Sequence, residues 1–209
     1  MTLRPWLRVA GLLLCLFAPL TGAAQASTST EATRAIEALH DSLLDVMRHA
    51  TELEYTGRTE KLTPVIPAHF DLDFMAQKAI GRRSWSAANA EERERYLDAF
   101  TRFMVANYAG RFDGFSGQSF ETVGEEAARS DTLLVKTQLI DPGQENIELN
   151  YRMRKVGKSW KIIDVYMDGT VSELALRRSE FASVVKRDGF DGLIKALDEK
   201  IAKLARGDG

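Results

Sequence analysis

Residues 146–167, NIELNYRMRKVGKSWKIIDVYM, set the architecture of this 209-residue chain. In the first half of the stretch, apolar side chains take every second position: Ile147, Leu149, Tyr151 and Met153. This period of two is that of a β-strand with one buried face. Gly157 and Lys158 form a two-residue turn, which joins antiparallel neighbours. The stretch therefore predicts a hairpin with strands over residues 146–156 and 159–167.

The second strand of this hairpin differs from the first because apolar side chains fall on both of its faces. Strict alternation places on one face Trp160, Ile162 and Tyr166, and on the other Ile163, Val165 and Met167. An ordinary antiparallel sheet has one apolar face and one wet face. A central strand with a helix on each side explains the pattern, and so does a strand that turns one face toward a cavity. The residues leave both interpretations open.

Two further strands and several helices complete the predicted architecture. Apolar residues alternate over 119–123 and 132–140, and a turn follows at 141–144. Apolar residues recur at helical spacing in five segments: 28–54, 72–80, Ser86 or Asn89 to Tyr108, Val171 to Val185, and Gly192 to Leu204. The order predicts one α+β domain, in which an antiparallel four-stranded sheet packs with helices from both termini.

Glycine and proline set the expected ends of the first helices. Gly57 is expected to end the first helix and Gly81 the second. Pro64 and Pro67 lie between them, so any helix there is expected to be short. Asp71 is expected to cap the helix that follows.

Residues 1–26 have the three parts of a secretory signal peptide. Two arginines precede a 12-residue apolar run, and Ala24 and Ala26 place small residues before the expected cleavage site. The run is shorter than the roughly 20 residues that span a membrane, which disfavours an uncleaved anchor. Cleavage removes Cys15, the single cysteine. We therefore expect a periplasmic protein in which residues 27–209 form a single domain.

Composition and motifs disfavour nucleic-acid binding and metal chemistry. The chain carries 28 Lys and Arg against 30 Asp and Glu, a net charge of −2, whereas nucleic-acid binding needs a basic face. The histidines are His40, His49 and His69. The first two lie nine residues apart on one predicted helix, which points them in opposite directions. We therefore expect no metal, no cofactor and no enzymatic activity.

Several stretches resemble the MlaC or toluene-tolerance family of periplasmic lipid carriers. They are FDLDFM at 70–75, GR at 81–82, IDVY at 163–166, DGTVSEL at 168–174 and RRSEF at 177–181. None is catalytic, so the resemblance rests on their order and spacing over nearly the whole mature chain. The last two stretches look closest to the hopanoid-associated HpnM branch of that family.

The resemblance implies a function and a set of partners. Members of this family enclose an apolar pocket between sheet and helices, in which acyl tails are buried while the head group stays near solvent. The cargo implied is a phospholipid or a hopanoid. The partners implied are an inner-membrane ABC transporter complex with its substrate-capturing subunit and an outer-membrane lipoprotein complex. The predicted fold therefore includes an enclosed apolar cavity.

The residues expected at this pocket combine large apolar side chains from helices and strands. Methionine side chains among them suit a surface that repacks around variable guests. The predicted lipid-contacting residues are Phe74, Met75, Phe100, Phe103, Met104, Tyr108, Tyr151, Met153, Ile163, Val165, Met167, Val171 and Phe181. The residues predicted at the mouth or in partner docking are Arg82, Arg83, Arg177 and Arg178.

Two other functions remain as alternatives. A small-molecule isomerase or hydrolase would use the same cavity, with Asp164 as its base. A periplasmic adaptor would have a solid core and no guest. Loss of activity in Asp164→Asn with lipid binding intact would identify the enzyme.

Overall fold

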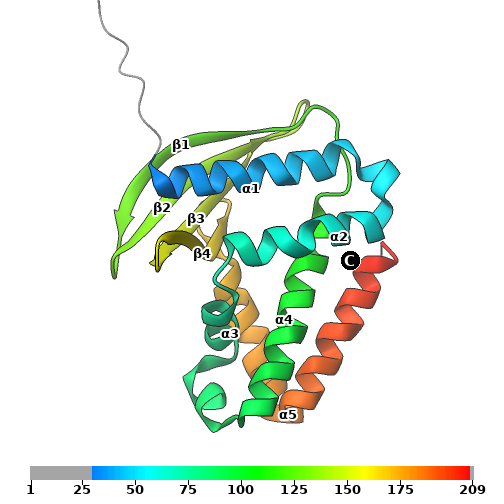
Figure 1. Ribbon diagram of the computed structural model, residues 1–209, viewed down its shortest axis with the longest axis vertical. Coiled ribbons are helices and arrows are strands. Elements are labelled where there is room, and N and C mark those ends of the chain that lie inside the picture. The colour runs from blue at the N-terminus through cyan, green and yellow to red at the C-terminus, as the bar shows by residue number, and fades with distance from the viewer. Residues whose placement is uncertain (1–29, 208–209) are drawn as a thin grey trace, which may run out of the picture.

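The computed structural model describes residues 30–207, which form one antiparallel sheet and five helices (Figure 1). The helices are α1 (Glu31–Arg48), α2 (Ala50–His69), α3 (Leu72–Ala87), α4 (Ala90–Arg111) and α5 (Glu173–Ala205). The strands are β1 (Ser119–Ala128), β2 (Thr132–Ile140), β3 (Ile147–Val156), β4 (Ser159–Met167) and β5 (Val171–Ser172). The predicted α+β class is confirmed. The predicted signal peptide, residues 1–26, lies outside the described residues.

The sheet has the order β1-β2-β3-β4-β5, and every neighbouring pair is antiparallel. The four predicted strands are confirmed, with β1 continuing to Ala128 instead of ending at Val123. The two-residue β5 adds a fifth. Helix α1 lies along one face of the sheet, and α3, α4 and α5 extend away from it as a second layer (Figure 1).

A β-bulge in β4 decides which face its apolar side chains occupy. Tyr151 pairs with Val165, but Met153 pairs with Ile162, so the register shifts by one residue between these pairs. Paired residues share a face of the sheet. Ile162 and Val165 therefore lie on the same face, and Ile163 falls on the opposite one with the polar side chains. The expected placement by strict alternation is wrong, because the bulge shifts the phase.

The first predicted helix is two helices. Instead of one helix over 28–54, α1 ends at Arg48 and α2 begins at Ala50. Helix α2 is kinked at Glu54, which has a φ of +52°. This left-handed conformation is uncommon for a residue with a Cβ atom. The predicted stop at Gly57 is also wrong, since α2 continues through it.

The same helix contains both prolines that were expected to keep it short. Pro64 and Pro67 lie on the exposed side of α2, where water can hydrate the carbonyl groups that lose their N–H partner. Leu62 and Ile66 lie on the other side and are fully buried. Their burial stabilises the helix, so tertiary packing overrides the local preference of proline.

Helix caps and kinks follow the sequence more closely. The carboxylate of Asp71 accepts a hydrogen bond from the Phe74 N–H at 3.2 Å and so caps α3, as predicted. Asn89 and Glu92 form a capping box at the start of α4. Gly81 and Gly189 have φ values of +79° and +72°, which interrupt the helical conformation inside α3 and α5. The predicted helix end at Gly81 and the predicted break between the last two helices are therefore seen as kinks.

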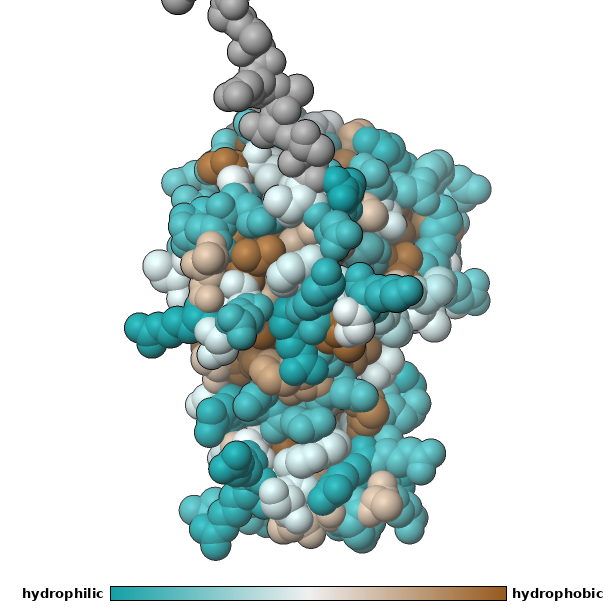
Figure 2. Space-filling model, turned by 60° about the vertical axis from the view of Figure 1, so that its left-hand side comes forward, coloured by the Kyte–Doolittle hydropathy of each residue, from teal (hydrophilic) through white to brown (hydrophobic). Residues whose placement is uncertain are grey.

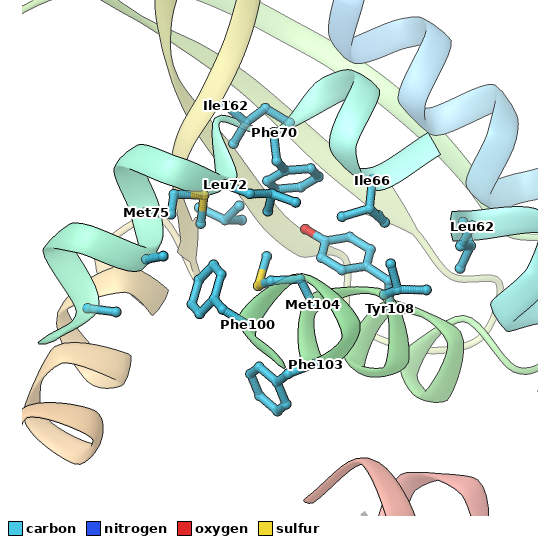
Figure 3. Close-up of a cluster of buried hydrophobic side chains, with 14 of the residues drawn as sticks. Leu62, Ile66, Phe70, Leu72, Met75, Phe100, Phe103, Met104, Tyr108 and Ile162 are labelled. Atoms are coloured by element: carbon cyan, nitrogen blue, oxygen red, sulfur yellow. The ribbon is translucent and has the colours of Figure 1, made fainter. Parts of the chain in front are cut away.

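The buried apolar side chains form one core between the sheet and all five helices, and Figure 3 shows the part where α2, α3 and α4 come together near Ile162 of β4. Met104 and Tyr108 of α4 point toward Phe70, and the rings of Phe70 and Tyr108 are 5.3 Å apart. Phe103 points the other way, toward α5, where its ring packs edge-on against Phe181 at 5.9 Å. Helix α4 is therefore buried on two sides, one toward Phe70 and the other toward α5.

Candidate functional site

A cavity of about 510 Å³ opens on the core face of the sheet, against β2, β3, β4 and the segment 111–118. We call it the inner cavity. Its apolar lining is Met47, Tyr108, Phe112, Phe115, Leu139, Ile147, Leu149, Tyr151, Val165 and Met167. The rest of its lining is Arg111, Asp113, Gly114, Ser116, Gln118, Asp141 and Glu173. The strands supply the apolar wall, and the mostly exposed residues of 111–118 form part of the rim.

Large apolar side chains are exposed at the edge of this cavity. On the face shown in Figure 2, polar side chains dominate and apolar ones reach the surface in separate patches. Phe115 is exposed and lines the inner cavity. Val171 is 44% exposed and pairs with Met167, a wall residue. The rim is thus partly apolar, which suits the entry of an apolar ligand.

The structure brings only some of the predicted lipid-contacting residues together. Four line the inner cavity: Tyr108, Tyr151, Val165 and Met167. Six are buried in the core: Met75, Phe100, Phe103, Met104, Met153 and Phe181. Phe74 and Ile163 line a pocket on the opposite face of the sheet, and Val171 lies at the cavity edge. The predicted set therefore combines part of a cavity wall with the core behind it.

Sequence reasoning missed several wall residues. Leu139, Ile147 and Leu149 lie on the same alternating face as Tyr151, so their period of two was a usable signal. Phe112 and Phe115 follow the end of α4 in a segment without regular structure. No periodicity marks such residues, and only the fold places them at the cavity.

The rim of the inner cavity carries more acid than base. The Arg111 guanidinium donates a hydrogen bond to Glu173 at 2.5 Å and contacts the Met167 sulfur at 3.6 Å. Asp113 and Asp141 also line the rim. Arg111 is the single cation among the described lining residues, and it is already paired.

The apolar wall contains two buried tyrosines that stay uncharged. Burial raises the pKa of both Tyr108 and Tyr151 well above the usual value. The Tyr151 hydroxyl lies 3.1 Å from the His40 Nε2 atom, so its polar end has a partner behind the wall. His40 also stacks on Phe120, with ring centroids 3.8 Å apart. The wall therefore presents neutral rings to the cavity.

The burial of His40 predicts a dependence of stability on pH. Burial, and secondarily the charge of His69, lowers the pKa of His40 to about 3. Below about pH 6.5, His40 is protonated in the unfolded chain but stays neutral in the folded protein. The free energy of unfolding therefore decreases as the pH is lowered. The loss from this group is about 1.4 kcal/mol per pH unit between about pH 6.5 and pH 3.

Urea unfolding at several pH values tests this dependence. His40→Gln is expected to flatten the fall in stability over this range, because it removes the buried titrating group. His49→Gln is the matched control, since His49 is an exposed histidine one residue beyond α1. An identical fall in the wild type and in His40→Gln would contradict the assignment.

Asp164 is placed where it holds the structure together. It is buried and accepts hydrogen bonds from the Ser172 hydroxyl at 2.6 Å, the Val165 N–H at 2.9 Å and the Leu174 N–H at 3.0 Å. Burial raises its pKa, and these hydrogen bonds act in the opposite direction. It lies on the face of β4 opposite the inner cavity. Asp164 therefore cannot act as a base on a guest in that cavity.

The opposite face of the sheet has a pocket of its own, of about 570 Å³, which we call the outer pocket. It lies between the sheet, α3 and the first turns of α5. Its lining is Phe74, Lys78, Ser130, Thr132, Arg152, Arg154, Ile163, Asp164, Ser172, Leu174, Ala175 and Arg178. The sheet separates this pocket from the inner cavity.

Three of the four arginines predicted at the mouth or in docking share one surface. Arg82, Arg83 and Arg178 line a groove of about 770 Å³ between α3 and α5. Arg177 points elsewhere, with its guanidinium 4.9 Å from the centre of the Phe103 ring. None of the four lines the inner cavity.

Two further features bear on function within residues 30–207. No three His, Cys, Asp or Glu side chains in this part of the chain are grouped to hold a metal ion. No helix in the same part has the length and hydropathy needed to cross a membrane.

Comparisons relate the chain to known proteins. Residues 37–199 match the family described as MlaC protein. The intermembrane phospholipid transport system binding protein MlaC of Haemophilus influenzae is 24% identical over 139 residues, which are 65% of this chain. The match spans 64% of the length of that relative. A phospholipid-binding protein from Ralstonia solanacearum, solved in complex with a phospholipid, gives a TM-score of 0.72 at 26% identity, covering 84% of this chain and 99% of that chain.

Proposed function

Because the chain belongs to the MlaC protein family, we propose that it is a periplasmic carrier that binds phospholipid for transport between membranes. The observation that carries this proposal is the inner cavity, an apolar space of about 510 Å³ on the core face of the sheet. The Ralstonia protein, which is similar along nearly its whole length, was solved with a phospholipid. The predicted signal peptide at 1–26 supports the periplasmic location.

The volume of the inner cavity suits one acyl chain. At about 510 Å³ the cavity lies within the roughly 300–1,000 Å³ range of small-ligand pockets. A second chain requires the cavity to widen. Met104 lies one helical turn from Tyr108, and Met153 follows Tyr151 on the same strand face, so flexible side chains adjoin the wall. We propose that a second chain displaces these methionines.

The energetics explain why such a carrier needs partners. Each methylene group that the carrier shields from water is worth about 0.8 kcal/mol, so a long acyl chain gains on the order of 10 kcal/mol. A bilayer offers the same gain, so transfer from membrane to protein is nearly balanced. The direction of lipid transfer must then come from partners or conformational states that differ in their affinity for the lipid. We propose that the carrier exchanges lipid with an inner-membrane ABC transporter complex, through its substrate-capturing subunit, and with an outer-membrane lipoprotein complex.

The rim suggests the class of head group. A phosphate at the rim would meet Asp113, Asp141 and Glu173, and it would compete with Glu173 for Arg111. A neutral polyol, or a head group with an amine, fits this acidic rim better than an anionic one. The segment 168–174, which resembles the hopanoid-associated HpnM branch, includes Glu173. We therefore propose a hopanoid as the finer alternative to a phospholipid cargo.

Loading from vesicles tests the proposed function and the cargo together. The delipidated protein is incubated with vesicles that contain phosphatidylethanolamine, phosphatidylglycerol and a polyol hopanoid, then separated and extracted. One bound lipid per protein is expected, with little phosphatidylglycerol. A preference for phosphatidylglycerol would contradict only the inference that the acidic rim disfavours an anionic head group, and the carrier proposal would stand. A protein that stays empty would contradict the carrier and favour the guest-free adaptor.

A further inference from the structure

The outer pocket combines an apolar floor with four cationic side chains. Phe74, Ile163 and Leu174 supply the apolar part. The cations are Lys78, Arg152, Arg154 and Arg178. The side chains of Lys78 and Arg154 both lie against the Phe74 ring, at 5.1 Å and 4.4 Å from its centre. Positive charge therefore gathers over an aromatic surface in a concave site.

Two of these cations already have partners. Arg154 forms an ion pair with Asp71, the residue that caps α3. Arg152 donates a hydrogen bond to the Thr132 hydroxyl at 3.0 Å and another to the Arg129 carbonyl at 3.0 Å. These contacts fix both guanidinium groups at the pocket wall.

The other two cations have no anionic partner. Within residues 30–207, neither Lys78 nor Arg178 forms an ion pair or a hydrogen bond. Asp164 is the single carboxylate among the described lining residues, and it is engaged by Ser172 and the start of α5. The pocket thus keeps two positive charges that the chain itself does not neutralise.

We propose that the outer pocket binds a phosphate group carried on an organic molecule. A phosphate monoester carries close to two negative charges at neutral pH, which matches the two unpaired cations, whereas a carboxylate carries one. Guanidinium groups bind phosphate oxygens in pairs, and lysine adds a mobile donor. The apolar floor fits the carbon part of the ligand. The source is either a small soluble phosphate or the head group of a lipid.

This site is independent of the proposed lipid carrier. It lies on the other face of the sheet, and none of its lining residues belongs to the inner cavity. A phosphate probe without acyl chains therefore tests the outer pocket alone, and its failure leaves the carrier proposal untouched.

The test is a calorimetric titration of the purified full-length protein at constant ionic strength. The probes are glycerol 3-phosphate and dihexanoyl phosphatidic acid, each up to about 10 mM. The test variant is the double substitution Lys78→Ala with Arg178→Ala. The matched control is Arg187→Ala with Lys195→Ala, which removes two exposed charges of α5 outside the pocket.

The expected result is binding that weakens at least about tenfold in the test variant and is unchanged in the control. Binding of glycerol 3-phosphate supports the proposal with a soluble phosphate as the source. Binding of dihexanoyl phosphatidic acid alone, weakened in the test variant, supports it with a lipid head group as the source. No binding of either probe, or equal binding by the test variant and the wild type, overturns it.

Discussion

Val165→Asp is expected to abolish lipid binding, with co-purified lipid falling at least about 100-fold. Val165 is 5% exposed and lies on the wall of the inner cavity, opposite Tyr151 in the register. A carboxylate there faces the methylene groups of the acyl chain without a hydrogen-bond partner. An unpaired buried charge costs several kcal/mol, which is enough to exclude the guest. The measurement is lipid extraction from purified protein, normalised to protein.

A second substitution keeps this prediction testable if Val165→Asp fails to fold. Met167→Asp places the charge on the same wall, near the rim, where Arg111 is within contact distance. It should fold more readily and still lower the bound lipid. Val123→Asp is the control, because Val123 is 59% exposed on β1 and does not line the cavity. A folded Val165→Asp or Met167→Asp protein that keeps wild-type lipid would place the tails elsewhere.

Phe181→Ala is expected to cost stability rather than binding. Phe181 is 1% exposed and packs edge-on against Phe100 and Phe103, with ring centroids 6.4 Å and 5.9 Å away. Truncating a buried phenylalanine typically costs about 3–5 kcal/mol. That is a large part of the roughly 5–15 kcal/mol that stabilises a domain. The folded fraction should still bind lipid, since Phe181 does not line the inner cavity.

Urea unfolding and lipid extraction on the same preparations separate these two effects. Leu176→Ala is the control on the same helix, because its side chain is exposed and should change stability little. If Phe181→Ala kept its stability but lost its lipid, Phe181 would belong to the binding surface. The residue would then have the role that its sequence pattern predicted.

Local patterns predicted the sheet well because local rules produce it. The predicted limits of β2 and β4, 132–140 and 159–167, match the observed strands. Alternating side chains mark each strand, and a two-residue turn joins β3 to β4. The caps at Asp71 and Asn89 are equally local, since each side chain bonds a backbone group three residues on.

The bulge in β4 could not be predicted from the hydropathy of the residues that form it. Ile162 and Ile163 are both apolar, so a phase shift between them leaves no mark in the hydropathy pattern. Only pairing with β3 reveals that Ile162 shares a face with Val165. Ile163 is buried on the opposite face, where it lines the outer pocket, so the hydropathy pattern alone does not assign these residues to their faces.

The sequence also does not distinguish residues that line the cavity from residues that fill the core. Tyr108 lines the inner cavity, while Met104, one turn earlier on the same helix, is buried beside it. Both are large apolar residues at helical spacing. The difference depends on how closely α1, α4 and the sheet approach one another, which is a tertiary property. The kink at Glu54 and the continuation of α2 through Pro64 likewise depend on tertiary packing and not on the local sequence.

The most direct test of a lipid tail in the inner cavity is photo-crosslinking. A phospholipid with a diazirine in the distal half of one acyl chain is loaded from vesicles and irradiated, and the modified residues are mapped by mass spectrometry. The account predicts labels on Leu149, Tyr151, Val165 or Met167, on the core face of β3 and β4. Labels confined to the outer pocket, at Phe74 or Ile163, or no label at all, would contradict it.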